Sequence, residues 1–174
     1  KKIREKTEEL LEFCGLIDFR RRTVRKLSGG MKRKLMVCRA LLTEPEILLL
    51  DEPTAGMDAL SRRQMWNLLR QLNDHNLTIL LTTHYMEEAE SLCQRVAFMD
   101  RGRLEEVSEP KKMVEQLGHF AVDEMTSDGL KSHYFKNRED AIAHLSRLTG
   151  QTALRNTTLE DVFVARAEQK ERQR

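Results

Sequence analysis

Ile47-Leu48-Leu49-Leu50-Asp51-Glu52-Pro53-Thr54 decides the fold, because four apolar residues run directly into two adjacent carboxylates. A short uninterrupted apolar run is typical of a strand that is buried on both faces of a parallel sheet. Open α/β sheets bind their ligands beyond the carboxyl ends of such strands. We therefore expect Asp51 and Glu52 to stand at the ligand-binding edge of an α/β sheet.

Downstream of this stretch, segments with apolar residues at helical spacing alternate with strand-like apolar segments. Apolar residues recur at helical spacing between Met65 and Leu72, and Leu77–Thr82 again reads as a buried strand. A short helix over 86–92 and a third strand over 96–99 follow. Strands that alternate with helices predict right-handed βαβ units in a layered α/β domain.

A glycine pair precedes the deciding stretch, in Leu27-Ser28-Gly29-Gly30-Met31. Ser28 is a plausible helix N-cap, and apolar residues from Met31 to Leu42 fall on one helical face. Glycines at a helix N-terminus let an anion approach bare backbone amides, where the helix dipole favours negative charge. An ordinary capped glycine turn is the alternative interpretation. Residues 3–13 predict a further, amphipathic helix.

The last third of the chain has weaker patterns. Asp100–Arg103 predicts a turn into a strand over 104–107, and Pro110 begins a helix that reaches Leu117. Beyond it we predict strands over 120–125 and 134–135, helices over 139–148 and 159–167, and a frayed end over 168–174. We divide the chain into residues 1–117, with a helical part (1–45) and a core (46–117), and an accessory segment (118–174).

Composition describes a globular chain rather than a disordered or membrane-spanning one. The 174 residues are 40% hydrophobic and 33% charged, with a net charge of +2. This near balance gives no argument for nucleic acid, although Arg20–Lys26 is locally basic and is either a solvated loop or a contact for an acidic partner. Three widely spaced cysteines predict reduced thiols rather than a disulfide framework. The start at Lys1, within a helical pattern, leads us to expect a piece of a longer protein.

The carboxylates and one histidine suggest phosphate chemistry. An Asp at a strand end can hold Mg²⁺ against nucleotide phosphates, and the adjacent Glu can orient or deprotonate an attacking water. Thr82-Thr83-His84 ends the second predicted strand in the same orientation. His84 can therefore hydrogen-bond a phosphate and the water.

These motifs together resemble the nucleotide-binding domain of ABC transporter ATPases. Leu27–Met31, Ile47–Thr54, Gly56-Met57-Asp58 and Thr82–His84 occur in that family's order and spacing. The resemblance implies a partial P-loop NTPase layered fold with parallel strands and flanking helices, plus a small α+β accessory segment. The stretch Thr158–Phe163 resembles the tail of drug- and lipid-exporting members.

The resemblance also implies a role for each motif residue. Ser28, Gly29 and Gly30 would form the signature motif, which serves the ATP held by the opposite protomer. Asp51 would be the Mg²⁺-binding Walker B carboxylate, Glu52 the catalytic base and His84 the switch histidine. Asp58 would belong to the D-loop, which crosses the dimer interface.

One expected motif is missing from the printed sequence. None of its eight glycines is followed by Lys, so the phosphate-cradling loop G-x-x-x-x-G-K-[ST] does not occur in these residues. A nucleotide site without this loop loses most of its affinity for ATP. We therefore predict that this chain alone neither binds ATP tightly nor hydrolyses it, and that it exposes strand edges and core faces.

The resemblance implies ATP and Mg²⁺ as cofactors, a second ATPase subunit and a transmembrane permease as partners, and no nucleic acid. It places the protein in the cytoplasm, held to the membrane through its permease. Two alternatives stay open: a soluble ABC-type ATPase that acts on nucleic acid or ribosomes, and a non-catalytic regulatory fragment.

Overall fold

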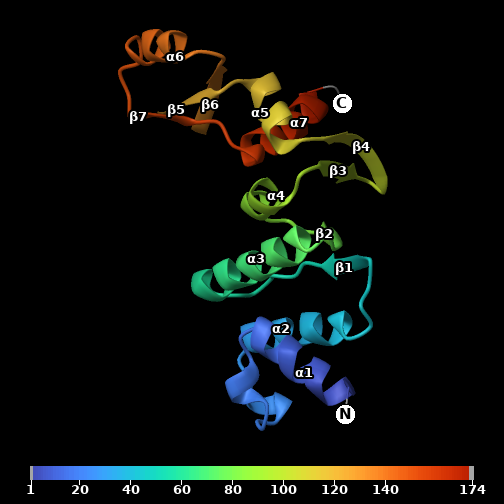
Figure 1. Ribbon diagram of the computed structural model, residues 1–174. Coiled ribbons are helices and arrows are strands. Elements are labelled where there is room, and N and C mark those ends of the chain that lie inside the picture. The colour runs from blue at the N-terminus through green and yellow to red at the C-terminus, as the bar shows by residue number, and fades with distance from the viewer. Residues whose placement is uncertain (1, 173–174) are drawn as a thin grey trace. The chain divides into compact units, whose positions relative to one another are not determined.

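The computed structural model describes residues 2–172. The chain folds into two compact units, which divide between residues 84 and 85. Figure 1 shows the elements of both units. The first unit contains two single-turn 3-10 helices in the loop after its first helix. Its elements are α1 (Lys2–Phe13), η1 (Ile17–Phe19), η2 (Val24–Lys26), α2 (Gly29–Leu41), β1 (Ile47–Asp51), α3 (Ala59–Asp74) and β2 (Thr78–Thr82).

A βαβ unit forms the centre of the first unit. Strands β1 and β2 pair in parallel, in a register that sets Ile47 opposite Thr78 and Asp51 opposite Thr82. The crossover helix α3 buries one apolar side, of which Met65 is completely buried. This pairing confirms the predicted parallel strands at residues 47–51 and 78–82.

Strand β1 is covered on one face only. Leu48 is 5% exposed and Leu49 is 69% exposed, although they are neighbours in the strand. Successive side chains point to opposite faces, and Leu49 lies beside the equally open Leu80. The expectation of burial on both faces is therefore wrong for these residues, whereas the expectation of exposed core faces is confirmed.

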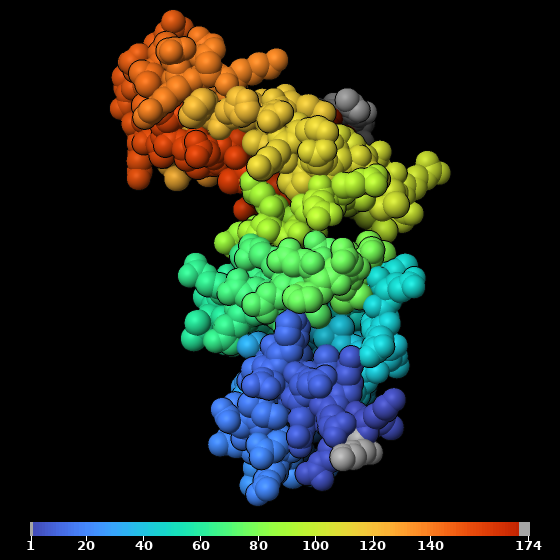
Figure 2. All heavy atoms as spheres, in the orientation of Figure 1, coloured from blue at the N-terminus to red at the C-terminus, as the bar shows by residue number. Residues whose placement is uncertain are grey.

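The loop between α1 and α2 is the basic stretch of this unit; Figure 2 colours it blue because it lies early in the sequence. Every residue from Arg20 to Lys26 is exposed. The guanidinium of Arg22 lies 4.8 Å from the centre of the Phe19 ring. This exposure fits both a solvated loop and a contact for an acidic partner.

The second unit continues with short helices and antiparallel strands. Its elements are α4 (Met86–Leu92), β3 (Val96–Asp100), β4 (Arg103–Ser108), α5 (Pro110–Leu117), β5 (Phe120–Thr126), β6 (Gly129–Phe135), α6 (Arg138–Leu145), β7 (Thr152–Asn156) and α7 (Leu159–Arg172). Within the described residues, β3 pairs antiparallel with β4. A tight turn makes this pairing possible, because Arg101 and Gly102 both take positive φ and return the chain at once.

The accessory residues form a three-stranded antiparallel sheet in the order β6-β5-β7. Strand β7 was not predicted, and β6 is longer than the two residues expected. Helix α7 packs its buried Leu159 and Val162 into an apolar cluster with Phe98 and Met113. The predicted strand over 120–125 and the helix beginning at residue 159 are confirmed.

A polar network ties β5, β7 and the start of α7 together. The Arg155 guanidinium donates from Nε and Nη2 to Asp123, at 2.7 and 3.1 Å, and from Nη1 and Nη2 to Asp161, at 2.7 and 2.8 Å. Asp161 also accepts from the backbone N–H of Thr158 at 2.8 Å, and its own N–H donates to the Thr158 hydroxyl at 3.4 Å. This reciprocal pair is a capping box. Residues of the Thr158–Phe163 stretch therefore cap and anchor α7.

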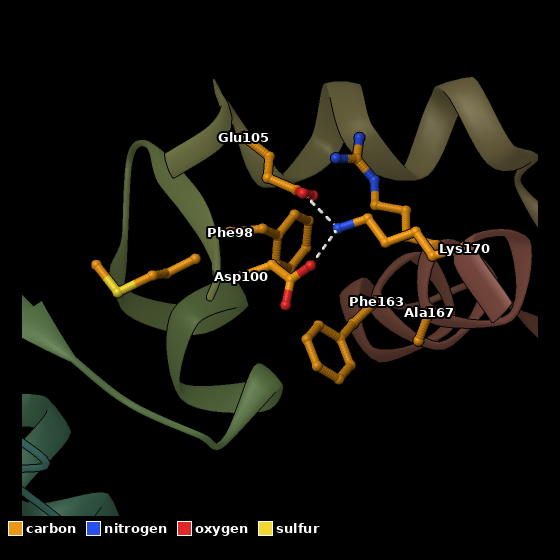
Figure 3. Close-up of a pocket in the computed structure, with 8 residues that line it drawn as sticks. Phe98, Asp100, Glu105, Phe163, Ala167 and Lys170 are labelled. Atoms are coloured by element: carbon orange, nitrogen blue, oxygen red, sulfur yellow. Dashed lines mark hydrogen bonds and ion pairs between the residues drawn. The ribbon is translucent and has the colours of Figure 1, made fainter. Parts of the chain in front are cut away.

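The C-terminal half of α7 is held on the β3–β4 hairpin (Figure 3). The Lys170 ammonium lies 2.9 Å from a carboxylate oxygen of Asp100 and also pairs with Glu105. The Phe98 and Phe163 rings lie 5.8 Å apart between the two elements. The expectation of a frayed end over 168–174 is wrong as far as Arg172, because these contacts hold the helix; residues 173–174 lie outside the described range.

Candidate functional site

The carboxyl ends of β1 and β2 bring three of the predicted site residues together. The Thr82 hydroxyl donates a short hydrogen bond to Oδ1 of Asp51, its partner in the register. The Glu52 backbone N–H donates to the Thr82 carbonyl at 3.0 Å and lies 3.2 Å from its hydroxyl oxygen. Thr82 therefore holds both the Asp51 carboxylate and the Glu52 backbone N–H in place. Its role was not predicted, although its place in the parallel register could have indicated it.

Glu52 leaves the strand in a strained conformation. Its φ is +44°, in the left-handed region that costs a residue with a Cβ about 1–2 kcal/mol. Such strain persists where surrounding contacts impose it, and it concentrates at functional sites. The two carboxylates make different contacts, Asp51 with Thr82 and Glu52 with His84.

Glu52 contacts His84. Oε1 of Glu52 lies 2.9 Å from Nδ1 of His84, and the two side chains are 45% and 56% exposed. When Nδ1 carries the proton it donates to the carboxylate, and Nε2 of a neutral ring is then left to accept. The histidine thus orients the carboxylate that stands at the strand end. A carboxylate held by a histidine in this way can serve as a base with an orienting partner.

The glycine pair opens α2 as predicted. The Ser28 hydroxyl oxygen accepts from the Met31 N–H at 3.2 Å and caps the helix. Gly29 and Gly30 follow at the first two helical positions, where backbone N–H groups have no partner within the helix. The end of α2 therefore offers bare amides and positive dipole charge to an anion.

Asp58 belongs with this glycine pair. Its Oδ1 accepts from the Ser61 N–H at 2.9 Å and caps α3, and hydrogen bonds from Ser61 lower the pKa of the Asp58 carboxyl. A Cβ added at Gly30 would lie 3.1 Å from the Cβ and the hydroxyl oxygen of Ser61. The first turn of α3 and the start of α2 are thus in close contact through Ser61. Sequence reasoning missed Ser61, and its position three residues after an N-cap was the available signal.

Asp51 is the candidate metal ligand. In the described part of the chain, no group of three or more His, Cys, Asp or Glu side chains is arranged to hold a metal ion. Mg²⁺ is commonly bound through one or two carboxylates plus water and substrate phosphates. A single strand-end carboxylate, fixed by Thr82, fits such a shared site.

Known proteins with similar sequences are ATP-binding proteins. Residues 2–55 match the family model described as ABC transporter. The Nod factor export ATP-binding protein I of Burkholderia pseudomallei strain K96243 is 39% identical over 176 residues, which cover 89% of this chain and 58% of that protein. The linearmycin resistance ATP-binding protein LnrL of Bacillus subtilis strain 168 is 32% identical over 84% of this chain and 47% of its own. This chain carries part of an ABC transporter ATPase domain.

Solved structures show a similar fold. The ADP conformation of MJ1267, an ATP-binding cassette of an ABC transporter, matches with a TM-score of 0.62 at 24% identity and covers 67% of this chain and 46% of that one. A nucleotide-free ATP-binding cassette matches with a TM-score of 0.60 at 25% identity, over 63% of this chain and 43% of that one. The predicted α/β class and partial P-loop NTPase fold are confirmed.

The chain spans about half the length of the curated relatives it matches, between 47% and 58% for the three examples from Burkholderia, Cupriavidus and Bacillus. Among residues 2–172, none of the helices has the length and apolar character to cross a bilayer.

Proposed function

We propose that the whole protein is the ATP-hydrolysing subunit of an ABC exporter, working from the cytoplasmic face of a membrane through a permease. The 2.9 Å contact between Glu52 and His84, at the carboxyl ends of two parallel strands, carries the proposal. The relatives favour export over the nucleic-acid and regulatory alternatives, since the Burkholderia and Cupriavidus proteins are named for Nod factor export.

Each strand-end residue has a proposed role in hydrolysis. Asp51 holds Mg²⁺, which would neutralise phosphate charge during phosphoryl transfer. Glu52 accepts a proton from the attacking water, or orients that water, through its carboxylate. His84 holds the Glu52 carboxylate in place and is near enough to the strand end to contact a terminal phosphate. The strained φ of Glu52 supports this assignment, because such strain concentrates at functional sites.

The glycine pair is proposed to act on a partner's nucleotide. Ser28, Gly29 and Gly30 offer amides and a hydroxyl at the α2 N-terminus to the phosphates of ATP bound by a second ATPase subunit. Asp58, held ionised beside Ser61, belongs to the same surface. The phosphate-cradling loop and the remaining sheet would come from other residues of the whole protein, covering the open face at Leu49 and Leu80.

Substitution of Glu52 tests this function in the full-length protein with its permease. Glu52→Gln keeps the side-chain size but removes the base, so we expect ATP turnover to fall about a hundredfold or more while ATP stays bound in a closed dimer. Glu46→Gln is the matched control, because Glu46 lies just before the other end of β1 and is exposed. Unchanged turnover in Glu52→Gln, measured as phosphate release, would refute the role of Glu52.

A further inference from the structure

Two histidine rings are in contact between β6 and α6 of the second unit. The centroids of the His133 and His144 rings lie 4.5 Å apart, and the ring planes are tilted by 51°. The Phe135 ring, two positions further along β6, lies 5.1 Å from the His144 ring. Helix α6 packs on all three strands of the accessory sheet. The His144 ring is therefore part of the contact that holds this helix on β6.

The strand register shows which charged groups share the sheet face of His133. Two positions before His133, Lys131 pairs with Glu124, so both lie on that face. Nε2 of His133 is 3.8 Å from Oε2 of Glu124, which is longer than an ordinary hydrogen bond. On β7 the same face carries the uncharged Thr152, Leu154 and Asn156. The other charged side chains on α6 and the segments next to it are exposed: Lys136, Arg138, Glu139, Asp140 and Arg147.

Positive charge on both rings would oppose this contact. Histidine gains its charge in mild acid, and two imidazolium rings at 4.5 Å repel each other. Nε2 of His144 is buried and, within residues 2–172, has no hydrogen-bond partner. A proton on that nitrogen would place charge where no acceptor stabilises it. The contact therefore favours uncharged rings.

The titration of His133 has the same direction. Burial and the charges of His144 and Lys131 lower its pKa, and Glu124 offsets only part of this effect. Because the unfolded chain then binds the proton more readily, neutral His133 stabilises the fold above the unfolded pKa of about 6.5. This stability is lost as the pH falls from about 6.5 towards the lowered folded value.

We propose that the His133–His144 contact is a pH-sensitive switch, which holds α6 on the accessory sheet at neutral pH and releases it in mild acid. With neutral rings, the two side chains pack between the helix and β6. Protonation places like charges at the contact, and the helix separates from the strand because the charged rings are better solvated apart.

The switch is chemically independent of the proposed ATPase activity. Both histidines belong to the second unit, whereas Asp51, Glu52 and His84 belong to the first. It also operates in a different pH range from the carboxylates that pair with Arg155, because histidine titrates between pH 5 and 8.

Amide hydrogen exchange of the full-length protein tests the switch at pH 7.5 and pH 5.5, after correction for the intrinsic pH dependence of exchange. We expect protection in α6 and β6 to be about tenfold lower at pH 5.5. In His133→Gln and in His144→Gln the loss should be less than twofold, because glutamine is polar but gains no charge. His119→Gln is the control, since His119 is an exposed histidine just before β5, and it should keep the tenfold loss. Equal protection at both pH values, or a tenfold loss that persists in either glutamine variant of the pair, would overturn the proposal.

Exchange of the carbon-bound ring proton reports the titration of each histidine separately. Trypsin releases His133 within residues 132–136, His144 within 139–147 and His119 within 113–131, so mass spectrometry distinguishes them. His133 should titrate at lower pH in the folded protein than in guanidinium chloride, and His144→Gln should reduce this difference. A merely structural role of His144 would leave the titration of His133 unchanged, and that result would refute the switch.

Discussion

Replacement of Arg155 by Met should strongly destabilise the accessory sheet. The guanidinium makes four hydrogen bonds to two carboxylates, whose side chains are 15% exposed in Asp123 and 9% exposed in Asp161. Met keeps much of the aliphatic volume but leaves two largely buried charges without their partner. Breaking a buried pair in this way costs 3–5 kcal/mol, and we take about 3 because the Arg155 side chain is 36% exposed.

Hydrogen exchange measures this loss segment by segment. A loss of about 3 kcal/mol should speed amide exchange in β5, β7 and the start of α7 about a hundredfold at neutral pH. Lys112→Ala is the control, because its pair with Glu109 joins side chains that are 60% and 52% exposed. Such an exposed pair contributes about 0.5 kcal/mol or less. Equal exchange in both variants would refute the reasoning.

Acid should reduce the difference in amide exchange rate between the Arg155→Met variant and the unsubstituted protein. Burial raises the pKa of Asp161, but hydrogen bonds from Arg155 and Thr158 outweigh it and hold the pKa below its ordinary value. A lowered carboxylate pKa contributes stability above the unfolded pKa of about 3.9, and this stability is lost as the pH falls through the folded value. The exchange difference should therefore shrink below about pH 4. A difference that grows in acid would contradict this sign.

Three further outcomes are expected. Gly118→Ala should lower the free energy of unfolding by about 3 kcal/mol or more, because the φ of Gly118 is +143° and a Cβ would lie 2.8 Å from the Phe135 carbonyl oxygen. Gly129→Ala should lower it by about 1–2 kcal/mol, because Gly129 has a φ of +118° but open space around it. Urea unfolding measures both losses. Asn137→Ala removes the N-cap that accepts from Asp140 and should lower the unfolding free energy by about 1 kcal/mol in the same assay. This chain alone should show no tight, Mg²⁺-dependent binding in a fluorescent-nucleotide titration; tight binding would contradict the need for the phosphate loop.

Local signals made much of the fold predictable. The apolar run before Asp51, the Ser28 cap and the turn at Gly102 each act through a few neighbouring residues, and each element was found where it was expected. Strand pairing was harder to predict from the sequence, because β3 pairs with β4 through a turn whose geometry the sequence only suggests. Strand β7, with a polar sequence, exists because β5 pairs with it along its whole length.

The candidate site could likewise be predicted where it depends on local sequence, but not where it depends on strand pairing. Asp51, Glu52 and His84 could be placed at strand ends because each lies within three residues after an apolar run. Their contacts depend on register, which determines that Thr82 faces Asp51 and that His84 reaches Glu52. Register is a property of two segments that are far apart in the sequence, so no local pattern reports it.

The close approach of Gly30 and Ser61 has an evolutionary consequence. A methyl group at position 30 would meet the Ser61 side chain at 3.1 Å, so each position limits the bulk that the other can accept. Ala at position 30 should be tolerated best together with Gly at position 61, and a residue larger than Ser at 61 should be tolerated better while 30 is Gly than when it is Ala. The two sites are therefore expected to mutate in compensating pairs, and the effect of either substitution on fitness depends on the other.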